Sequence, residues 1–298
     1  MHRPVAFHRS WPVSGRYPTL DVTARSGARS HEGSISSARP GTSAGVFALC
    51  GDVCVSIVLA ACDVIAPLAA LTDAIVRPMR TVRVCRGFAS NGIDLWTALS
   101  GIWSSRIARE ALRMLMAAGL GRAVLDRIVV SGNVAALNRG AVLAICHSPW
   151  GRVLAGWISR DGRIALLATN RWSTRATGAH EPASRRGMRR AIGRLQGGRC
   201  VAITIDHFSA DGCKMMFLNR PVRVCDGAAR IAALGCVPLV PVVVRKIGGR
   251  IDISIGIEIR VTPDTVEAAT MASVAALDLA VAHDPSIWAD VLEFVSAR

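Results

Sequence analysis

A short apolar run, residues 141–146, leads directly into His147 and constrains the fold of this chain more than any other stretch. A continuous apolar run of this length, bounded by turn-forming residues, predicts a buried β-strand. Pro149 and Gly151 end the strand, and Ser148 is placed to cap a helix that starts at Pro149. The pattern therefore places His147 at the C-terminal end of a core strand, where open α/β sheets bind their ligands.

Apolar runs and amphipathic segments alternate along the rest of the chain. Strands are predicted at 141–146, 164–169, 200–205, 215–218, 222–224, 238–244 and 251–259, and helices at 93–119, 184–195, 226–234, 264–281 and 287–295. Strands interleaved with helices are typical of an α/β domain. We therefore predict one α/β domain over residues 81–298, with a mixed, mainly parallel sheet flanked by helices.

The N-terminal part divides into two segments of contrasting composition. Residues 1–45 are rich in Arg, Ser, Gly and Pro, which predicts a disordered extension. Residues 46–76 are strongly apolar and predict an N-terminal apolar helix, followed at once by a cluster of arginines. Its longest uncharged run, 53–62, is shorter than the roughly 20 residues that a membrane span needs. We predict that residues 46–80 form a membrane-associating helix, and a helix buried on the domain is the alternative.

The chain is strongly basic, with a formal net charge of +15 over 298 residues. Such a charge suits acidic partners: nucleic acid, an anionic lipid surface or an acidic carrier protein. No basic block is interleaved with aromatic residues, and the chain has one Tyr and six Phe, so a nucleic-acid partner is not expected. The nine cysteines form no CxxC pair. We expect buried, reduced thiols and no metal site.

Several segments occur in an order that resembles the bacterial lipid A late acyltransferases. A strand ends in His147, a basic helix precedes Gly197 and Gly198, and a strand ends in Asp206. The clearest piece is residues 195–244, LQGGRCVAITIDHFSADGCKMMFLNRPVRVCDGAARIAALGCVPLVPVVV. Near the C-terminus, residues 283–288 (HDPSIW) resemble the family's His-x-Pro-x-x-Trp element. The resemblance covers roughly residue 93 to the C-terminus.

The resemblance implies a glycerolipid acyltransferase-like fold and a transferase of the lipopolysaccharide biosynthesis type. Such an enzyme moves a fatty acyl chain from acyl carrier protein, or from coenzyme A, to a hydroxyl of a lipid A precursor or another lipid. It would work at the cytoplasmic face of the inner membrane, held to the anionic surface by residues 46–76. We expect no cofactor, because the sequence shows no Gly-rich phosphate loop and no metal-ligand cluster.

The family motif is a histidine, four residues and then a carboxylate. In base-assisted acyl transfer the imidazole takes the proton of the attacking hydroxyl, and the carboxylate orients the ring and stabilises the imidazolium. Here His147 fills the first position and Arg152 the last. A cation cannot orient the ring, and it penalises the imidazolium. Either Asp206, at the end of another strand, replaces the carboxylate, or Arg152 binds a phosphate while His147 works alone.

A second pair of candidates lies in the loop after the third predicted strand. His207, three residues and then Asp211-Gly212 resemble the His-x-x-x-Asp-Gly motif of the carrier-protein and coenzyme A condensation/acetyltransferase superfamily. The resemblance implies that His207 is the base and Asp211 a structural support. The motif is short, and the flanking residues fit the lipid acyltransferase pattern better. The candidate catalytic residues are therefore His147, Asp206, His207 and Asp211.

Several basic residues lie where they could bind the phosphate of a donor or acceptor. Arg186 and Arg189 belong to a basic helix face, while Lys214 and Arg220 flank the loop that follows Asp206. With Arg152, these residues are the candidate substrate-binding residues. A solvated helix face is an equally good interpretation of the arginines.

These patterns lead to three functional hypotheses. The first is an acyltransferase that acts on a lipid or glycolipid. The second, motivated by Arg152 in the carboxylate position, is a catalytically degenerate homologue that binds lipid or acyl chains without turnover. The third is acyl transfer to a non-lipid acceptor on the same scaffold.

Overall fold

The computed structural model describes residues 42–88, 93–168, 180–182, 184–291 and 294. Most of the predicted extension, residues 1–41, lies outside the described residues. The helices are α1 (Thr42–Val76), α2 (Pro78–Phe88), α3 (Leu95–Ala117), α4 (Gly121–Leu125), α5 (Ala136–Arg139), α6 (Gly151–Asp161), α7 (Arg185–Gln196), α8 (Gly227–Gly235) and α9 (Val266–His283), with 3-10 turns η2 (Pro263–Thr265) and η3 (Pro285–Ile287). The strands are β1 (Ile128–Gly132), β2 (Val142–Ile145), β3 (Ile164–Ala168), β4 (His180–Pro182), β5 (Cys200–Thr204), β6 (Phe208–Phe217), β7 (Arg220–Val224), β8 (Leu239–Ile247) and β9 (Arg250–Ile255).

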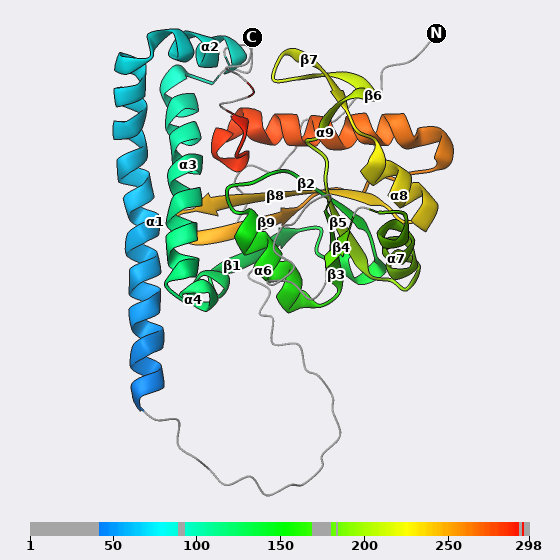
Figure 1. Ribbon diagram of the computed structural model, residues 1–298, viewed down its shortest axis with the longest axis horizontal. Helices are drawn as coiled ribbons and strands as arrows, with labels where there is room; N and C mark the ends of the chain where they lie inside the picture. The colour runs from blue at the N-terminus through cyan, green and yellow to red at the C-terminus, as the bar shows by residue number, and fades with distance from the viewer. Residues whose placement is uncertain (1–41, 89–92, 169–179, 183, 292–293, 295–298) are drawn as a thin grey trace, which may run out of the picture. The chain divides into compact units, whose positions relative to one another are not determined.

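Seven strands form one sheet in the order β1-β9-β8-β2-β5-β3-β4. Among these described strands, β8 and β9 pair antiparallel, and every other neighbouring pair is parallel. The antiparallel pair is a hairpin with Gly248, at φ 57°, in its turn. The predicted α/β fold, with a mixed and mainly parallel sheet flanked by helices behind an N-terminal apolar helix, is confirmed (Figure 1).

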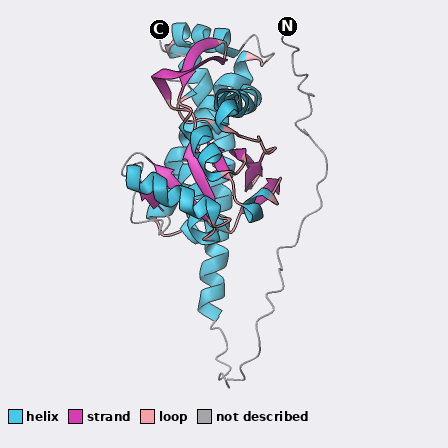
Figure 2. Ribbon diagram, turned by 90° about the vertical axis from the view of Figure 1, so that its right-hand side faces the viewer, coloured by secondary structure: helices cyan, strands magenta, loops and turns pink. Residues whose placement is uncertain are grey.

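Helices cover both faces of this sheet, as Figures 1 and 2 show. Side chains alternate along a strand, so successive residues of β2 enter two different cores. Val142 and Ala144 pack among residues of α7, α8 and α9. Leu143 and Ile145 pack among residues of α4, α5 and α6 instead. Because both faces are buried, β2 is apolar throughout, which is why its sequence reads as a continuous run.

Helix α1 lies along α3 and buries one face of its own (Figure 1). The buried residues recur at steps of three and four, as one face of a helix requires: Val55, Leu59, Cys62, Ala66, Ala70 and Asp73. The carboxylates that interrupt the apolar run are paired with cations. Asp63 pairs with Lys246 of β8, and Asp73 pairs with Arg80 of α2. Asp52 Oδ1 lies 3.6 Å from Nη2 of Arg127, which precedes β1.

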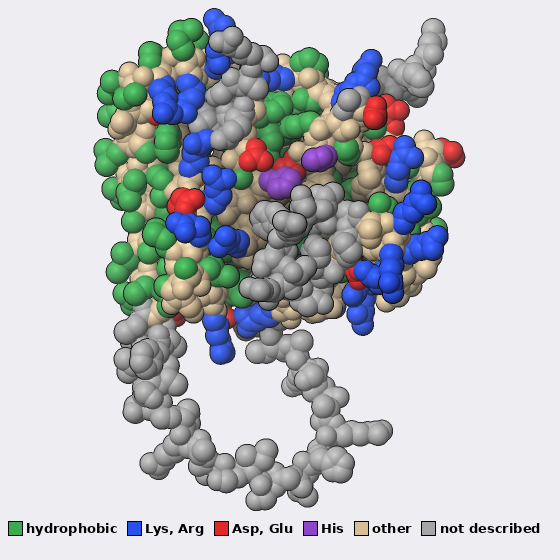
Figure 3. Space-filling model, viewed as in Figure 1, with side chains coloured by type: hydrophobic (Ala, Val, Ile, Leu, Met, Phe, Trp, Pro, Cys, Tyr) green, Lys and Arg blue, Asp and Glu red, His purple; other side chains and the backbone are tan. Residues whose placement is uncertain are grey.

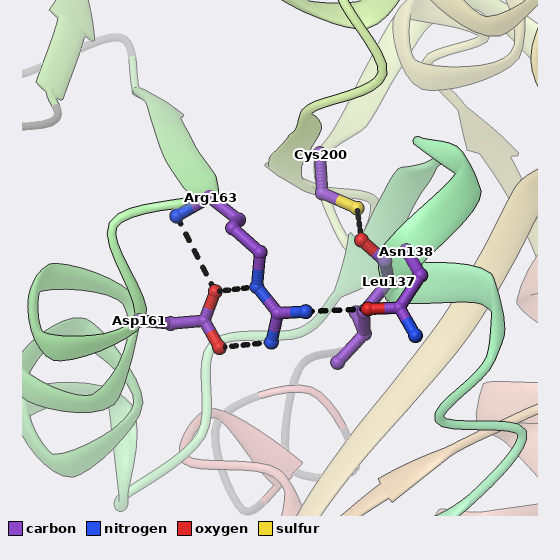
Figure 4. A network of polar contacts seen from close by, with 5 residues as sticks. All are labelled: Leu137, Asn138, Asp161, Arg163 and Cys200. Atoms are coloured by element: carbon purple, nitrogen blue, oxygen red, sulfur yellow. Dashed lines mark hydrogen bonds and ion pairs between the residues drawn. The ribbon is translucent and has the colours of Figure 1, made fainter. Parts of the chain in front are cut away.

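A polar network holds the ends of several elements together where β3 and β5 begin (Figure 4). The Arg163 guanidinium donates to both carboxylate oxygens of Asp161, at 2.7 and 2.6 Å, and to the Asn138 side-chain oxygen at 2.5 Å. The Cys200 thiol lies 3.6 Å from the Leu137 carbonyl oxygen. This network ties α5 and α6 to the starts of β3 and β5, at the opposite end of β5 from Asp206.

Several local predictions differ from the structure. Strand β6 begins at Phe208, seven residues before the predicted start, and pairs with β7 through a turn with left-handed Leu218 and Asn219. Helix α6 begins at Gly151, and its N-cap is Trp150 rather than Ser148. A helix is predicted to begin at residue 287, but this residue is the last of the 3-10 turn η3, and Trp288 is extended. Strand β1 was not predicted, because its alternating exposure gives only a weak apolar pattern.

The predicted burial of the cysteines is only partly correct. The thiols of Cys62, Cys146 and Cys200 are buried, whereas Cys54 and Cys236 are exposed. These five cysteines are free, and so are Cys213 and Cys225.

Candidate functional site

The site forms where β2 and β5 end. The two strands are parallel neighbours, with Ile145 paired to Thr204, and the Ile205 amide continues the ladder with a 2.9 Å hydrogen bond to the Ile145 carbonyl. Two residues beyond this pair, the same register brings His147 beside Asp206. The structure therefore joins the predicted strand-end histidine to the carboxylate of the neighbouring strand, although 59 positions separate them in the sequence.

The Asp206 carboxylate is buried and accepts hydrogen bonds from two other segments of the chain, the one after β2 and the one after η3. Its Oδ1 lies 2.9 Å from His147 Nδ1, and its Oδ2 accepts the His147 main-chain N–H at 2.7 Å. The indole N–H of Trp288 donates to the same Oδ2, also at 2.7 Å. The Asp206 side chain is 1% exposed and the His147 side chain 37%. The imidazole therefore has one nitrogen committed to the carboxylate, which leaves Nε2 to meet a substrate.

The environment of His147 favours its protonated form. The hydrogen bond that the ring donates to Asp206 raises the pKa of His147, burial opposes the rise, and the negative charges of Asp206 and Asp290 add to it. This is the electrostatic arrangement that a general base needs, because the imidazolium formed by proton transfer is stabilised where it forms. Because the pKa is raised, a higher pH is needed to produce the neutral, proton-accepting form than for an ordinary histidine.

Main-chain hydrogen bonds fix the turn that carries His147. The Trp150 amide donates to Ser148 Oγ at 3.1 Å, and the Gly151 amide donates to the Ser148 carbonyl at 2.9 Å. The Ala289 amide, from the C-terminal segment, donates to the His147 carbonyl at 2.7 Å. Figure 3 shows histidine and acidic side chains gathered on the face of the molecule that this view presents.

Arg152 does not take the place of a carboxylate in this geometry. It is exposed in the first turn of α6 and forms no hydrogen bond or ion pair with another described residue. The pKa of Glu110 on α3 is lowered mainly by the hydrogen bond and the charge of Arg113. The charges of Arg109 and then Arg152 make smaller contributions in the same direction. Arg152 thus lies near α3, and Asp206 is the residue that meets His147.

His207 and Asp211 are both exposed, and no hydrogen bond or ion pair joins their side chains within the described part of the chain. Asp211 lies in β6, where its amide contacts Ser209 Oγ at 3.5 Å. The extended strand separates the two residues that the short motif places together. The structure brings together His147 and Asp206, and it does not bring together His207 and Asp211.

The predicted substrate-binding residues are dispersed over four elements, with Arg152 on α6. Arg186 and Arg189 are exposed on α7, and Lys214 is exposed on β6. Arg220 of β7 donates to the Phe294 carbonyl at 2.7 Å and lies over the Phe294 ring, 5.7 Å from its centroid. Arg220 therefore has a structural contact with the C-terminal segment. The substrate-binding roles of all these residues stay predictions.

A cavity of about 330 Å³ lies beside α7, away from His147. Its lining includes Arg190, Arg194 and the buried Glu181. Burial raises the pKa of Glu181, but hydrogen bonds from the two arginines, at 2.5 and 3.2 Å, outweigh it and hold the pKa below its usual range. Arg199, which precedes β5, also lines the cavity, whereas Asp206 follows the far end of that strand. The cavity is thus separate from the His147–Asp206 pair.

Two residues near the pair were not predicted to belong to the site. The sequence pattern marks Trp288 only as part of the His-x-Pro-x-x-Trp element, and it does not mark Asp290, whose charge contributes to the raised pKa of His147. No sequence motif could have identified Trp288 and Asp290, because both residues lie near His147 only through contacts between segments that are distant in the sequence. Within the described residues, no group of three or more His, Cys, Asp or Glu side chains could hold a metal ion.

Comparisons with known proteins show structural similarity at low sequence identity. No family model matches the chain, and no curated protein matches it. Among solved structures, the chain is similar to the 1-acyl-sn-glycerophosphate acyltransferase PlsC from Thermotoga maritima. The two are 14% identical, with a TM-score of 0.34, and the similarity covers 79% of this chain and 98% of that chain.

Proposed function

We propose that the chain is an acyltransferase that moves a fatty acyl group from a thioester donor to a hydroxyl of a lipid. The observation that carries this proposal is the His147–Asp206 pair, with Nδ1 held 2.9 Å from a buried carboxylate at the C-terminal edge of the sheet. The resemblance to the lipid A late acyltransferases supplies the substrate class. The donor in this proposal is acyl carrier protein or acyl-coenzyme A, and the acceptor is a lipid A precursor or a related lipid.

In the proposed reaction, His147 Nε2 removes the proton of the acceptor hydroxyl as its oxygen attacks the thioester carbonyl carbon. The Asp206 carboxylate orients the ring and stabilises the imidazolium. The tetrahedral intermediate then breaks its C–S bond, and the departing thiolate takes the proton back from the imidazolium. The products are an ester and a free thiol, and no further reactant is required.

The test compares the full-length protein with His147→Ala in detergent. The assay supplies acyl carrier protein loaded with a labelled acyl chain, together with bacterial lipid, and follows labelled ester. We expect ester from the wild type and only the enzyme-free rate from His147→Ala, because the base is gone. His207→Ala serves to test the rival pair. Equal background turnover by the wild type and His147→Ala would support the alternative of a degenerate lipid-binding homologue.

We further propose that α1 attaches the protein to the cytoplasmic face of the inner membrane without spanning it. One side of α1 carries Ile57, Val64, Leu68 and Ile75, which are 61–71% exposed and lie in line along the helix. The side opposite packs on the domain. Insertion across the bilayer would separate Asp63 from Lys246 and place a charge in hydrocarbon. A helix that lies in the interface keeps that pair and buries only its exposed apolar side.

Replacing Ile57, Leu68 and Ile75 together by Asn should lower binding to vesicles that contain anionic phospholipid by at least about tenfold, since burial of each side chain contributes roughly 1.5–3 kcal/mol. Flotation of the full-length protein measures the bound fraction. In the matched control, Leu234 and Ile257, which are exposed apolar residues outside α1, are replaced by Asn. This variant should bind the vesicles as strongly as the wild type does. Binding of the triple variant at wild-type strength, or a wild type that stays unbound, would contradict attachment through α1.

A further inference from the structure

We propose that Trp288 is a positioning residue that holds the Asp206 carboxylate in the orientation His147 needs. This inference rests on the proposed function, because it assigns a partner to the same pair. The indole N–H donates to Asp206 Oδ2 at 2.7 Å, while Oδ1 of the same carboxylate lies 2.9 Å from His147 Nδ1. Trp288 thus contacts the carboxylate on the side away from the imidazole ring and acts only through Asp206.

A buried carboxylate needs donors for both oxygens, because an unpaired buried charge is strongly unfavourable. Oδ2 has two donors, the His147 amide and the Trp288 indole, and both bonds measure 2.7 Å. Two donors on one oxygen fix the plane of the carboxylate and leave the other oxygen directed at the ring. Without the indole, the amide alone would hold Oδ2, and the carboxylate could rotate about its Cβ–Cγ bond.

The surroundings of Trp288 make the indole a rigid donor. It is 2% exposed, and it packs edge-on against Phe217, with ring centroids 5.1 Å apart. Its ring is tilted against that of Phe294, with centroids 5.3 Å apart. The turn that carries it is capped by Asp284, whose Oδ1 accepts the Ser286 amide at 3.0 Å. A side chain held on several sides loses little further freedom when it donates its hydrogen bond.

The same segment also holds the backbone of the base. One residue after Trp288, the Ala289 amide donates to the His147 carbonyl at 2.7 Å. On its other side, Pro285 packs on Gly101 of α3 so closely that a Cβ at Gly101 would lie 3.2 Å from Pro285 Cδ. The segment from Pro285 to Ala289 therefore connects α3 with both members of the pair, and its geometry is set by packing rather than by the pair itself.

The Trp288→Phe variant tests the proposal, because it keeps an aromatic ring against Phe217 and Phe294 and removes the N–H donor. It also removes part of the ring volume, and the control variant below loses the same volume. We expect kcat to fall about tenfold to a hundredfold, with little change in KM. This is the range found when a residue that orients a metal-binding side chain through a hydrogen bond is replaced. With one donor fewer on Oδ2, more of the carboxylate charge acts on the imidazole. The pKa of His147, measured by NMR titration of the imidazole, should then rise by about 0.5–1 unit, the equivalent of one ordinary hydrogen bond.

Trp103→Phe is the matched control. Trp103 lies on α3, and its buried indole N–H has no hydrogen-bond partner among the described residues, so the same substitution removes no bond there. The proposal is supported if Trp288→Phe changes kcat and the His147 titration while Trp103→Phe changes neither. It is overturned if the two variants behave alike.

A further measurement on the unmodified protein keeps the proposal testable if Trp288→Phe does not fold. The indole N–H resonance of Trp288 should shift with the titration of His147, because the two groups share one carboxylate, and a resonance that ignores this titration would overturn the proposal. The titrations also separate this inference from the proposed function. If the wild type transfers no acyl group but its Trp288 resonance follows His147, the acyltransferase proposal fails and the positioning role stands.

Discussion

Asp206→Asn should lower kcat by about 10²–10⁴-fold while the protein stays folded. The reason lies in the donors that surround the residue. The His147 amide and the Trp288 indole both donate to the position of Oδ2, so the Asn oxygen has to face them. The Asn NH₂ then faces His147 Nδ1 and donates to it, which leaves the ring proton on Nε2. A ring protonated at Nε2 cannot take a proton from the acceptor hydroxyl.

The pH dependence of the rate provides a second readout of the same variant. The activity of the wild type should rise with pH through the raised pKa of His147, so its acid limb lies at higher pH than an ordinary histidine would give. The hydrogen bond from the His147 ring to the Asp206 carboxylate is the largest cause of that shift, and Asp206→Asn should therefore move the limb to lower pH. A profile that is identical in both proteins would mean that another group limits the rate.

Asp252→Asn is a suitable control, because Asp252 is also buried and accepts a hydrogen bond from Ser131 Oγ at 2.7 Å, but lies in β9. It should change the stability and leave kcat near that of the wild type. Arg152→Glu places a carboxylate where the family motif has one. A large gain in rate from Arg152→Glu would show that the native pair is defective and would contradict the role given to Asp206.

Gly140→Ala is expected to destabilise the fold by about 2–6 kcal/mol, the sum of a strained backbone and an overpacked contact. Gly140 precedes β2 with φ 81° and ψ 132°, a region that residues with a Cβ rarely adopt. A Cβ there would also lie 3.0 Å from the Gly198 carbonyl carbon and 3.2 Å from the Arg199 carbonyl oxygen. Both neighbours are backbone atoms at the start of β5 and cannot move aside independently of that strand.

Thermal unfolding measures this effect, and a fall in Tm on the order of 5–20 °C is expected. Gly162→Ala is the matched control. Gly162 also has a positive φ, 69°, but no atom lies within 4 Å of a Cβ built on it, so only the backbone term of about 1–2 kcal/mol applies. If Gly140→Ala and Gly162→Ala lower Tm equally, the close packing of Gly140 against the start of β5 does not contribute to the destabilisation.

The sequence was sufficient for the parts of the site that depend on local pattern. The apolar run before His147 and the run before Asp206 each predict a strand, and both residues follow strands in the structure. The order of strands in the sheet is a tertiary property, so the sequence could not establish that β2 and β5 are neighbours. For that reason Asp206 was only one of two explanations for Arg152. The catalytic roles of both residues stay predictions.

The parts that were missed depend on contacts between distant segments. Trp288 was predicted to lie in a helix, but the packing of η3 on α3 leaves it extended and directed at Asp206. The carboxylates of α1 were seen as interruptions of an apolar run. Their role became clear only from partners such as Lys246, which is 183 residues from Asp63. No periodicity within a segment encodes contacts of this kind.

The parallel register of β2 and β5 has a consequence for how this chain can diverge. In the proposed mechanism the carboxylate partner of His147 comes from the neighbouring strand. We therefore expect weak selection for a carboxylate five residues after the histidine, which lets the first turn of α6 change its charge. We expect selection to act instead on residue 206 and on the residues that donate hydrogen bonds to its carboxylate. Among relatives of this chain, we expect position 152 to vary widely wherever an aspartate at position 206 and a tryptophan at position 288 are retained together.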